Sequence, residues 1–498
     1  MLTDEILAKY DMTVGIECHV QLATATKLFS GADNDARDKS PNSVVSPIDY
    51  GLPGMLPVLN RGAVDLAIKA GKALNSTINH ISRFDRKHYF YPDLPKGYQT
   101  TQMYQPIIGA GFVEAPLEDG GSVKVRINHA HMEEDAGKLT HSSGYSLVDL
   151  NRAGTPLIEI VSEPDIHSAV EAKAFATELY RLMTYAGVTN GDLYHGNMRF
   201  DVNVSAAPKG SAELGLRAEV KNLNSFRSVE RATDYEFRRQ VELLERGEKV
   251  VQETRGWDEA KQKTTSQRSK EDAQDYRYMP DADIPPIVLT DEEIAAIQSE
   301  VPRLPSYYRE AWKNIGLDNT VINALLISRQ TAELIERIRA NSNDKIARRV
   351  AFWFIKALNG NLNQDVAVQN NDQPISDSHF ISLAQMVEDG RLKTLAEMVE
   401  GEKLNSNAGD IIFFEMLRSS EDPESIAKSK NLIQESDEGV ITGIVDEVLN
   451  DPLSAKAVED LRNGNDKVIG FLVGQVMKKS QGKANPGLVQ KIIRERIK

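Results

Sequence analysis

The sequence has 498 residues, of which 41% are hydrophobic and 27% charged, a composition typical of globular proteins. This length allows two to four domains, no apolar run is long enough to cross a membrane, and the acidic N-terminal residues predict no signal peptide. The single cysteine, Cys18, excludes an internal disulfide framework and a cysteine-rich zinc site, and favours a reducing cytoplasm. A net charge of −14 argues against non-specific nucleic-acid binding by the whole surface, but not against a local basic patch.

Up to about Pro286 the sequence alternates between strand and helix patterns. Apolar residues recur at every second position in five segments, residues 12–22, 123–132, 155–162, 198–205 and 216–225. Because these segments alternate in polarity, they favour an antiparallel sheet with one face in water over a parallel sheet covered on both faces. Two stretches between them, residues 61–74 and 168–187, have helical periodicity.

The sequence changes character after the proline-rich segment "DADIPPIV". Thr290 and the acids that follow it predict a helix start, and the pattern stays helical to the end, including residues 319–340. An Asn-, Gln- and Asp-rich stretch, residues 359–377, is expected to be an exposed loop. We therefore predict an α+β fold class, with an antiparallel-sheet domain and flanking helices before an all-α domain and a helical tail. The predicted domains are residues 1–290, 291–420 and 421–498.

An acidic cluster, "HAHMEEDAGK" at residues 129–138, is the first candidate functional feature. If the alternation of residues 123–127 continues, the face of Val125 goes on to carry His129, His131, Glu133 and Asp135. Glu134 then points the other way. A bound divalent cation would keep such close carboxylates ionised. For this cluster taken alone, an acidic turn in water or a protonated pair is the better explanation.

Other predicted strands also carry acids and bases on their polar faces. Glu17 and His19 share one face, while Cys18 projects toward the core with its apolar neighbours. The further polar-face residues are Glu159, Arg199, Asp201, Glu219 and Lys221. Solvent explains each face alone, but several together predict one cleft suited to Mg²⁺ and phosphates. A histidine beside two glutamates also suits Mn²⁺ or Zn²⁺, so the metal stays open. The cations expected to neutralise phosphate are Lys138, Lys221, Arg268 and Lys270.

The common nucleotide-binding and acyl-transfer signatures are missing from the sequence. There is no GxxxxGK[ST] loop, and "IIGAGFVEA" has Glu114 at the third glycine position of a dinucleotide loop. No GxSxG elbow occurs, "SSGYS" at residues 142–146 is better explained as a turn, and Cys18 is expected in the core. Any ATP site is therefore of a rarer type.

Several longer motifs resemble one family over nearly the whole chain. They are "GIECHVQL", "DRKHYFYPDLPKGYQTTQ", "HMEEDAGK", "LNRAGTPLIEIVSEPD", "EVKNLNSFR", "ETRGWDE", "RSKEDAQDYRYMPDADIPP" and "GFLVGQVMKKSQGKANP". On these residues the chain resembles the B subunits of the aspartyl/glutamyl-tRNA amidotransferases (the GatB/GatE family), with Met132 where the family usually has leucine. The resemblance implies an antiparallel "cradle" domain, a helical domain and a YqeY-like helical tail that contacts tRNA.

The resemblance also implies an activity and partners. The cradle would use ATP and Mg²⁺, or Mn²⁺, to phosphorylate the side-chain carboxylate of Glu or Asp in mischarged Glu-tRNA(Gln) or Asp-tRNA(Asn). Ammonia would then displace phosphate to give the amide. The implied partners are a glutaminase A subunit, a bridging C subunit and the non-discriminating synthetase, in the cytoplasm. Some members carry a cysteine zinc knuckle, so a chain with one cysteine is not expected to hold a structural zinc.

Carried over residue by residue, the family's metal and phosphate cleft falls on Glu17, His19, Glu133 and Glu134. Glu219 and Lys221 are further catalytic candidates. The candidates for contact with ATP are Lys138, Glu159, Asp201, Arg268 and Lys270. Alternation favours Glu133 over Glu134 as the metal ligand, but a β-bulge would reverse that assignment.

The last residues of the chain are basic although the protein is acidic. Lys478, Lys479 and Lys483 are expected to contact tRNA phosphates, with a solvated helical face as the alternative. Two other functions are a tRNA-binding scaffold and a synthetase-like adenylating enzyme. The presence of Glu17 and Glu133 argues against the scaffold, and the lack of HIGH-type and KMSKS-type motifs argues against the adenylating enzyme.

Overall fold

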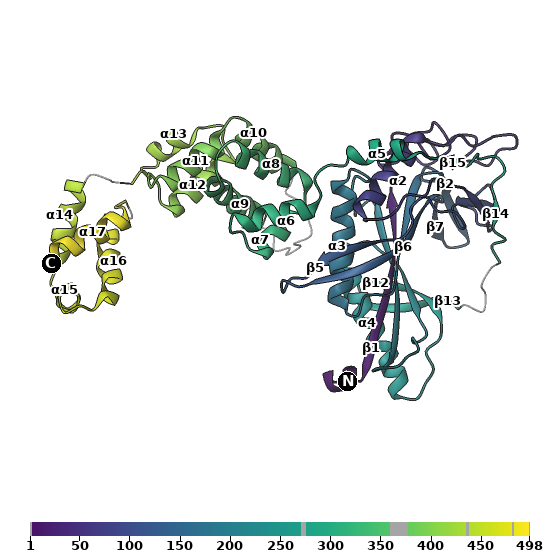
Figure 1. Cartoon of the computed structure of the whole chain (residues 1–498), viewed down its shortest axis with the longest axis horizontal. Coiled ribbons are helices and arrows are strands. Elements are labelled where there is room, and N and C mark those ends of the chain that lie inside the picture. The colour runs from purple at the N-terminus through teal and green to yellow at the C-terminus, as the bar shows by residue number, and fades with distance from the viewer. Residues whose placement is uncertain (1, 270–274, 359–376, 435–437, 481–482, 498) are drawn as a thin grey trace. The chain divides into compact units, whose positions relative to one another are not determined.

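The computed structural model describes residues 2–497 apart from 270–274, 359–376, 435–437 and 481–482. The chain forms two compact units, Met1–Tyr308 and Arg309–Lys498, here called the N-terminal and C-terminal units (Figure 1). The boundary predicted near residue 290 falls inside the first unit, and that near residue 420 falls inside the second. The three-part division stays a prediction. The loop expected at residues 359–377 falls almost wholly outside the described residues.

An eight-stranded sheet, counted in the described residues, forms the centre of the N-terminal unit. In spatial order its strands are β13 (Lys263–Ser269), β12 (Glu253–Asp258), β11 (Ala218–Leu223), β10 (Met198–Pro208), β1 (Tyr10–Gln21), β9 (Pro156–Ser162), β6 (Ser122–Glu134) and β5 (Gly111–Pro116). Neighbouring strands are antiparallel except β11 and β12, which are parallel. The predicted antiparallel sheet is therefore confirmed, with one parallel pair that the sequence did not predict.

Smaller sheets and a hairpin accompany the main sheet. They are β3 (Asp85–His88) with β4 (Tyr98–Thr101) and β14 (Met279–Pro280), β2 (Ile81–Ser82) with β15 (Ile287–Val288), and the hairpin β7 (Lys138–Ser142) and β8 (Tyr145–Asp149). The hairpin turn falls within "SSGYS", where Gly144 has a φ of 86°. The side chains of His141 and Ser146 hydrogen-bond beside it. The turn predicted for this segment is therefore confirmed.

Helices complete the core of the N-terminal unit. They are α1 (Asp4–Leu7), α2 (Arg61–Ala73), α3 (Ala169–Tyr185), α4 (Phe226–Glu245) and α5 (Asp291–Ser299), and α6 (Pro305–Asn314) spans the boundary between the units. α3 and α4 contact each other and the sheet (Figure 1). Each begins at a serine whose side chain accepts a backbone hydrogen bond, Ser168 for α3 and Ser225 for α4. The sequence predicted α2 and α3 but not α4.

The polarity of β1 shows how the sheet divides core from solvent. Val14, Ile16, Cys18 and Val20 are each at most 1% exposed, while the residues between them are only partly buried. Every second side chain of a strand projects to the same face, so one face of β1 packs in the core and the other stays accessible. The prediction that Cys18 faces the core is confirmed.

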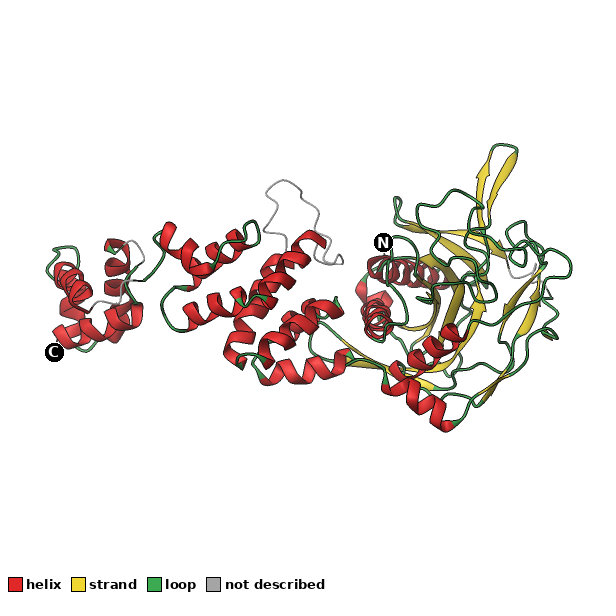
Figure 2. Cartoon of the chain, turned by 90° about the horizontal axis from the view of Figure 1, so that it is seen from above, coloured by secondary structure: helices red, strands yellow, loops and turns green. Residues whose placement is uncertain are grey.

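The described residues of the C-terminal unit form helices and loops (Figure 2). After α6 the helices are α7 (Asn319–Leu325), α8 (Arg329–Ala340), α9 (Asp344–Leu358), α10 (Asp377–Glu388), α11 (Arg391–Glu400), α12 (Ser406–Met416), α13 (Pro423–Ser429), α14 (Glu438–Leu449), α15 (Ala455–Arg462), the 3₁₀-helix η2 (Asp466–Val468), α16 (Ile469–Lys479) and α17 (Pro486–Ile497). α14 to α17 enclose a core of aliphatic residues. The helical C-terminal region predicted from sequence is confirmed.

Capping residues set helix boundaries in both units. Thr290 accepts from Glu293 N and Glu293 reaches back to Thr290 N, which confirms the predicted start of α5. The single helical pattern predicted over residues 319–340 is interrupted between α7 and α8, because Ser328 caps α8 by accepting from Thr331 N. No described helix combines the length and apolar character that a bilayer-spanning segment requires.

Candidate metal centre

β1 supplies two of the candidate residues. Because Cys18 lies in the core, Glu17 and His19 project from the opposite, accessible face. The antiparallel register then sets their neighbours: Glu17 lies opposite Asp201 of β10, and His19 lies opposite Glu159 of β9. Polar side chains from three strands therefore meet on one face, although they are far apart in the sequence.

β6 reaches the same face through a β-bulge. Its register against β9 shifts between Ile127 and His129, so the buried face of Val125 and Ile127 continues at Ala130. The predicted continuation of one face from Val125 through His131 is therefore wrong, because the extra residue reverses the alternation. Because the bulge lies before Glu133 and Glu134, these two side chains still point to opposite faces of β6.

The result is a compact group of His19, His131, Glu133 and Glu159, here called the histidine–glutamate cluster. His19 Nδ1 lies 3.3 Å from Glu133 Oε1 and 3.8 Å from Glu159 Oε2. His131 Nε2 lies 3.4 Å from Glu159 Oε2 and 3.8 Å from Glu133 Oε2. Ligand atoms of His19, Glu133 and Glu159 all lie within 4.8 Å of one another, a spacing that one metal ion can bridge.

A second group lies beside the first and is here called the carboxylate cluster. Oxygens of Glu17, Asp201 and Glu219 lie within 4.8 Å of one another. Lys221 Nζ lies 3.0 Å from Asp201 Oδ2 and 2.7 Å from Glu219 Oε1, and Asn203 donates to Glu17. Lys221 offsets part of the negative charge of these carboxylates, so the carboxylate cluster needs a bound cation less than the histidine–glutamate cluster does.

Burial and neighbouring charges act in opposite directions on these groups. Burial lowers the pKa of His19, but the surrounding carboxylates, led by Asp201 and Glu133, raise it well above its usual value. Burial raises the pKa of Glu133, yet the two histidines beside it hold that pKa below its usual range. The pKa of Glu17 is raised by its burial and by nearby carboxylates. A metal ion that bound at the cluster would displace a proton from His19.

The donor set of the histidine–glutamate cluster fits a divalent cation. Among the described residues, the buried Nδ1 atom of His19 has no hydrogen-bond partner. Buried polar atoms are normally paired, and a metal ion at Nδ1 would satisfy this one. One imidazole nitrogen with two carboxylate oxygens suits Mn²⁺ or Zn²⁺, and also suits Mg²⁺ when water completes the shell.

The structure separates Glu133 from Glu134. Glu134 is buried on the other side of β6, where its carboxylate binds the Lys96 ammonium and the backbone N–H of Thr100. Asp135 follows and pairs with Arg199. Of the two neighbouring glutamates, only Glu133 lies in the histidine–glutamate cluster.

The other candidates differ in their placement. Lys138 is exposed at the start of β7. Arg268 pairs with Thr254 through the backbone of β13, but its side chain and all of Lys270 lie outside the described residues. In the tail, Lys478 and Lys479 are exposed and Lys483 is half-buried.

His131, to which the sequence gave no role, belongs to the site, and Lys87 interacts with it electrostatically. His131 contacts both glutamates of the cluster and stacks on His129, with ring centroids 5.3 Å apart. Burial lowers the pKa of Lys87, but the charge of Glu133 and other acidic groups raises it above its usual value. The signal for His131 was its spacing from Glu133. Lys87 lies in a short strand whose position could not be read from periodicity.

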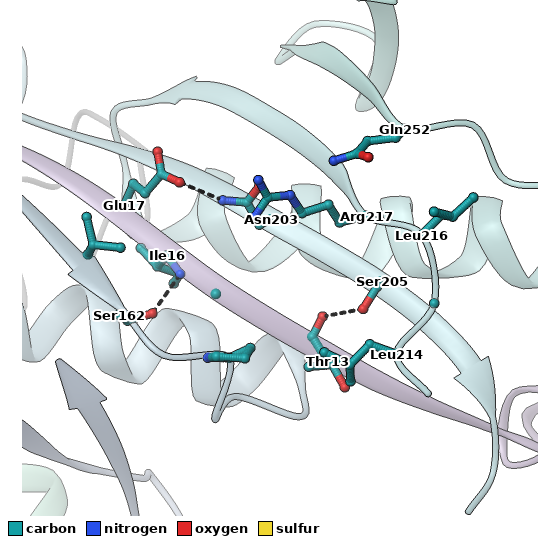
Figure 3. A pocket seen from close by; sticks show the side chains of 14 residues that line it. Thr13, Ile16, Glu17, Ser162, Asn203, Ser205, Leu214, Leu216, Arg217 and Gln252 are labelled. Atoms are coloured by element: carbon teal, nitrogen blue, oxygen red, sulfur yellow. Dashed lines mark hydrogen bonds between the residues drawn. The ribbon is translucent and has the colours of Figure 1, made fainter. Parts of the chain in front are cut away.

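A cleft of about 320 Å³ adjoins the carboxylate cluster (Figure 3). Glu17 stands at one end, and Gly15 lines the cleft on the same face of β1, where a Cβ would make only ordinary contacts with Pro164 and Ser162. Leu214, Leu216 and Arg217 line the side formed by the segment before β11, as Figure 3 shows. An apolar wall with a few polar groups beside charged residues is the usual composition of a small-molecule site.

Two family models match this chain. A family model described as the GatB/GatE catalytic domain matches residues 12–295, and one described as the GatB domain matches residues 333–497. Both clusters lie within the first match. The two matches define a GatB-type protein, with a catalytic domain followed by a helical domain.

Similar proteins cover nearly the whole length of the chain. The aspartyl/glutamyl-tRNA(Asn/Gln) amidotransferase B subunit of Persephonella marina is 42% identical over 491 residues, 98% of this chain and 100% of that protein. The corresponding B subunit of Carboxydothermus hydrogenoformans is 40% identical over 498 residues, 99% of each chain. The chain belongs to the family of aspartyl/glutamyl-tRNA(Asn/Gln) amidotransferase B subunits, so the family predicted from the sequence motifs is confirmed.

Proposed function

We propose that this chain is the B subunit of a glutamine-dependent tRNA amidotransferase, a ligase that forms a carbon–nitrogen bond. With ATP it phosphorylates the side-chain carboxylate of Glu or Asp esterified to tRNA, and ammonia then displaces the phosphate. The observation that supports this most is the histidine–glutamate cluster, which lies inside the match to the GatB/GatE catalytic domain. A scaffold that only bound tRNA would not require buried acids grouped at metal-ligand spacing.

In this proposal His19, Glu133 and Glu159 are the metal ligands. A bound Mg²⁺ or Mn²⁺ ion would neutralise phosphate charge and orient the transferred group. His131 holds the two glutamates in place through its contacts of 3.4 and 3.8 Å. Because phosphoryl transfer to a carboxylate brings anions together, catalysis depends mainly on positioning and charge neutralisation. Lys221 and Lys87 contribute positive charge at the edge of the cluster.

ATP fits this arrangement with its nucleoside in the cleft of Figure 3. Leu214 and Leu216 offer apolar contact to a base, and Arg217 lies between that wall and Glu17. The triphosphate then extends past the carboxylate cluster toward His19. Phosphate contacts by Lys138, Arg268 and Lys270 are proposed from the sequence alone, because positive charge suits phosphate.

The remaining reactants come from outside the chain. Its single cysteine is buried in the core, so it is unsuited to act as a glutaminase nucleophile. We assign glutamine hydrolysis to an A subunit, with a C subunit in the same complex, and place the reaction in the cytoplasm. Lys478, Lys479 and Lys483 contact the tRNA body through its phosphates. The substrates are Glu-tRNA(Gln), Asp-tRNA(Asn) or both.

The test is reconstitution with the A and C subunits. Each mischarged tRNA is offered with ATP, Mg²⁺ and either glutamine or ammonium chloride. We expect amidated tRNA with both nitrogen donors, because the transfer site lies in this chain and is separate from the glutaminase. An intact complex that hydrolyses glutamine but amidates neither tRNA, even with ammonium chloride, would contradict the proposal. Binding of a non-hydrolysable ATP analogue to the chain alone separates an enzyme from a scaffold.

A further inference from the structure

A β-bulge lies beside Asp201, at the junction of the two clusters. β10 and β11 pair Phe200 with Leu223 and Val202 with Val220. Two residues of β11, Lys221 and Asn222, therefore stand opposite Asp201 alone. Bulges of this kind re-aim side chains and backbone groups, and they are over-represented next to active sites.

Asn222 adopts an unusual backbone conformation in this bulge. Its φ is +62°, in the left-handed region that residues with a Cβ seldom occupy, although asparagine tolerates it better than most. The conformation turns the backbone N–H of Asn222 onto Asp201 Oδ1, at 2.8 Å. Its side chain is exposed, so the contact that the bulge creates is made by the backbone. Strained conformations of this kind persist where the surrounding structure uses them.

The bulge fixes both oxygens of Asp201. Oδ1 accepts from Asn222 N–H and Oδ2 accepts from Lys221 Nζ at 3.0 Å. The Asp201 side chain is only 5% exposed, so little solvent competes for it. Oδ2 also lies 3.8 Å from Nε2 of His19, on the edge of the ring opposite the glutamates.

The two edges of the His19 ring therefore face different groups. Nε2 faces a carboxylate whose own position is fixed and which already carries the Lys221 ammonium. Nδ1 faces Glu133 at 3.3 Å and Glu159 at 3.8 Å. Because the ammonium repels a second cation, the side of Nδ1 is the better place for a metal ion. Histidine ligands commonly direct their other nitrogen to a carboxylate, which fixes the ring and the tautomer.

We propose that Asn222 is a positioning residue for the metal centre. The left-handed conformation of Asn222 fixes the Asp201 carboxylate through the backbone N–H, and Asp201 Oδ2 in turn orients the Nε2 edge of the His19 ring. His19 Nδ1 then points toward the metal ion, together with Glu133 and Glu159. The inference rests on the proposed metal role of His19. It adds that the backbone conformation of an exposed asparagine, and not its side chain, controls the affinity of the site.

Three substitutions separate backbone from side chain. Asn222→Gly removes the side chain but adopts the left-handed conformation freely. Asn222→Ala and the β-branched Asn222→Val remove the same amide and disfavour that conformation increasingly. Asn431→Val is the matched control, because Asn431 is also exposed and left-handed, with φ +55°, but lies after α13 in the C-terminal unit.

The measurement uses the full chain and Mn²⁺ alone. Free Mn²⁺ is counted by electron paramagnetic resonance to give Kd, and pulsed spectra detect coupling of bound Mn²⁺ to an imidazole nitrogen. Thermal unfolding of each variant measures the structural cost separately. We expect wild type, Asn222→Gly and Asn431→Val to share one Kd and the nitrogen coupling. Asn222→Val should bind about tenfold more weakly or worse, as is common when an outer partner of a metal ligand is lost, with weaker coupling and Asn222→Ala between them.

The possible failures are distinguishable. If wild type binds Mn²⁺ tightly with nitrogen coupling but Asn222→Val and Asn222→Ala match it, the positioning role of Asn222 is wrong and the metal centre stands. If Asn222→Gly loses as much affinity as Asn222→Val, the side chain acts instead of the backbone, which also overturns the inference. Wild type without nitrogen coupling would overturn both the inference and the metal role proposed for His19. If Asn222→Val does not fold, Asn222→Ala against Asn222→Gly decides.

Discussion

Charged residues gather in both units, but the two units hold them differently. In the sheet of the N-terminal unit Glu133 and Asp201 are 4% and 3% exposed, and each has a charged partner on another strand. In the tail, the ion pair between Lys479 and Glu447 joins side chains that are 44% and 67% exposed. Exposed pairs contribute little to stability, whereas buried charges need partners to exist at all. The sheet therefore groups its charges in two buried clusters, whereas the tail leaves its charges exposed to solvent.

The largest effect on amidation is expected from substitution of Glu133, a buried acid of the histidine–glutamate cluster. Glu133→Gln keeps the shape of the side chain and removes the charge that would hold the metal ion. Amidation by the reconstituted complex should fall by about a thousandfold or more, and Mn²⁺ affinity should fall with it. Glutamine hydrolysis by the partner subunit should continue. Amidation rate, Mn²⁺ Kd and glutaminase rate are measured on the same preparation.

Glu134→Gln is the matched neighbour for that experiment. Its carboxylate binds Lys96 and Thr100 on the other side of β6, so its loss should lower the unfolding temperature. The Mn²⁺ affinity of the folded protein should change much less than in Glu133→Gln. If Glu134→Gln abolished Mn²⁺ binding while Glu133→Gln preserved it, the assignment of the two glutamates would have to be exchanged.

The next effect concerns the cleft beside the carboxylate cluster. Gly15→Val adds a side chain to the lining of this cleft without a clash in the protein itself, since a Cβ at this position meets no atom closer than 3.9 Å. Valine suits a strand, so the fold should be retained. Overlap with a bound nucleoside should weaken ATP-analogue affinity by about tenfold to a hundredfold, the effect of a clash of about 1–3 kcal/mol. Mn²⁺ affinity without nucleotide serves as the control and should be unchanged. Unaltered ATP-analogue binding in a folded Gly15→Val protein would place the nucleoside elsewhere.

The tail gives a smaller and salt-dependent effect. Replacing Lys478, Lys479 and Lys483 by alanine should weaken tRNA binding about tenfold at moderate salt and flatten its salt dependence, because fewer counterions are released. The same replacement at Lys209, Lys249 and Lys345, which are exposed outside the tail, controls for net charge. ATP-analogue binding should be unchanged in both triple variants. If the two triple variants had equal tRNA affinity and equal salt slopes, the tail lysines would not contact tRNA and would only be exposed to solvent.

The smallest functional effect is expected at Cys18. Cys18→Ser places a hydroxyl in the core and should lower the free energy of unfolding by about 1–3 kcal/mol. Amidation and glutamine hydrolysis, per folded complex, should stay at the wild-type rate, because the thiol faces away from both clusters. Chemical denaturation and both activity assays check this. If the isolated chain hydrolysed glutamine and Cys18→Ser abolished that activity, the assignment of glutamine hydrolysis to the A subunit would be wrong.

The alternation of polar and apolar residues predicted which face of a strand each side chain occupies, but it did not predict which strands lie next to one another. Alternation placed Cys18 in the core with Glu17 and His19 opposite, since side chains alternate wherever a strand is regular. It failed at the bulge between Ile127 and His129, because an inserted residue leaves no mark in the apolar pattern. His19 lies opposite Glu159 because β1 pairs with β9, and the order of strands in a sheet cannot be predicted from residue periodicity.

The helices show a similar limit. Thr290 predicted its own helix start, because a capping box is a local arrangement of a few residues. The break between α7 and α8 was missed, since Ser328 caps a helix inside a continuous apolar pattern. Periodicity placed Glu17, His19 and Glu133 on polar faces of strands, and the family motifs then assigned all three to a metal and phosphate cleft. Asn222 escaped both approaches, because its contribution comes from a backbone angle.

The most direct test of the account is to locate the metal ion. Crystals of the chain in its complex, soaked with Mn²⁺ and measured at the manganese absorption edge, give an anomalous difference map. The account predicts one strong peak bonded to His19 Nδ1 and to carboxylate oxygens of Glu133 and Glu159, and its loss in Glu133→Gln. A strong peak bonded to Glu134, or no peak near His19 at Mn²⁺ concentrations that support amidation, would contradict it.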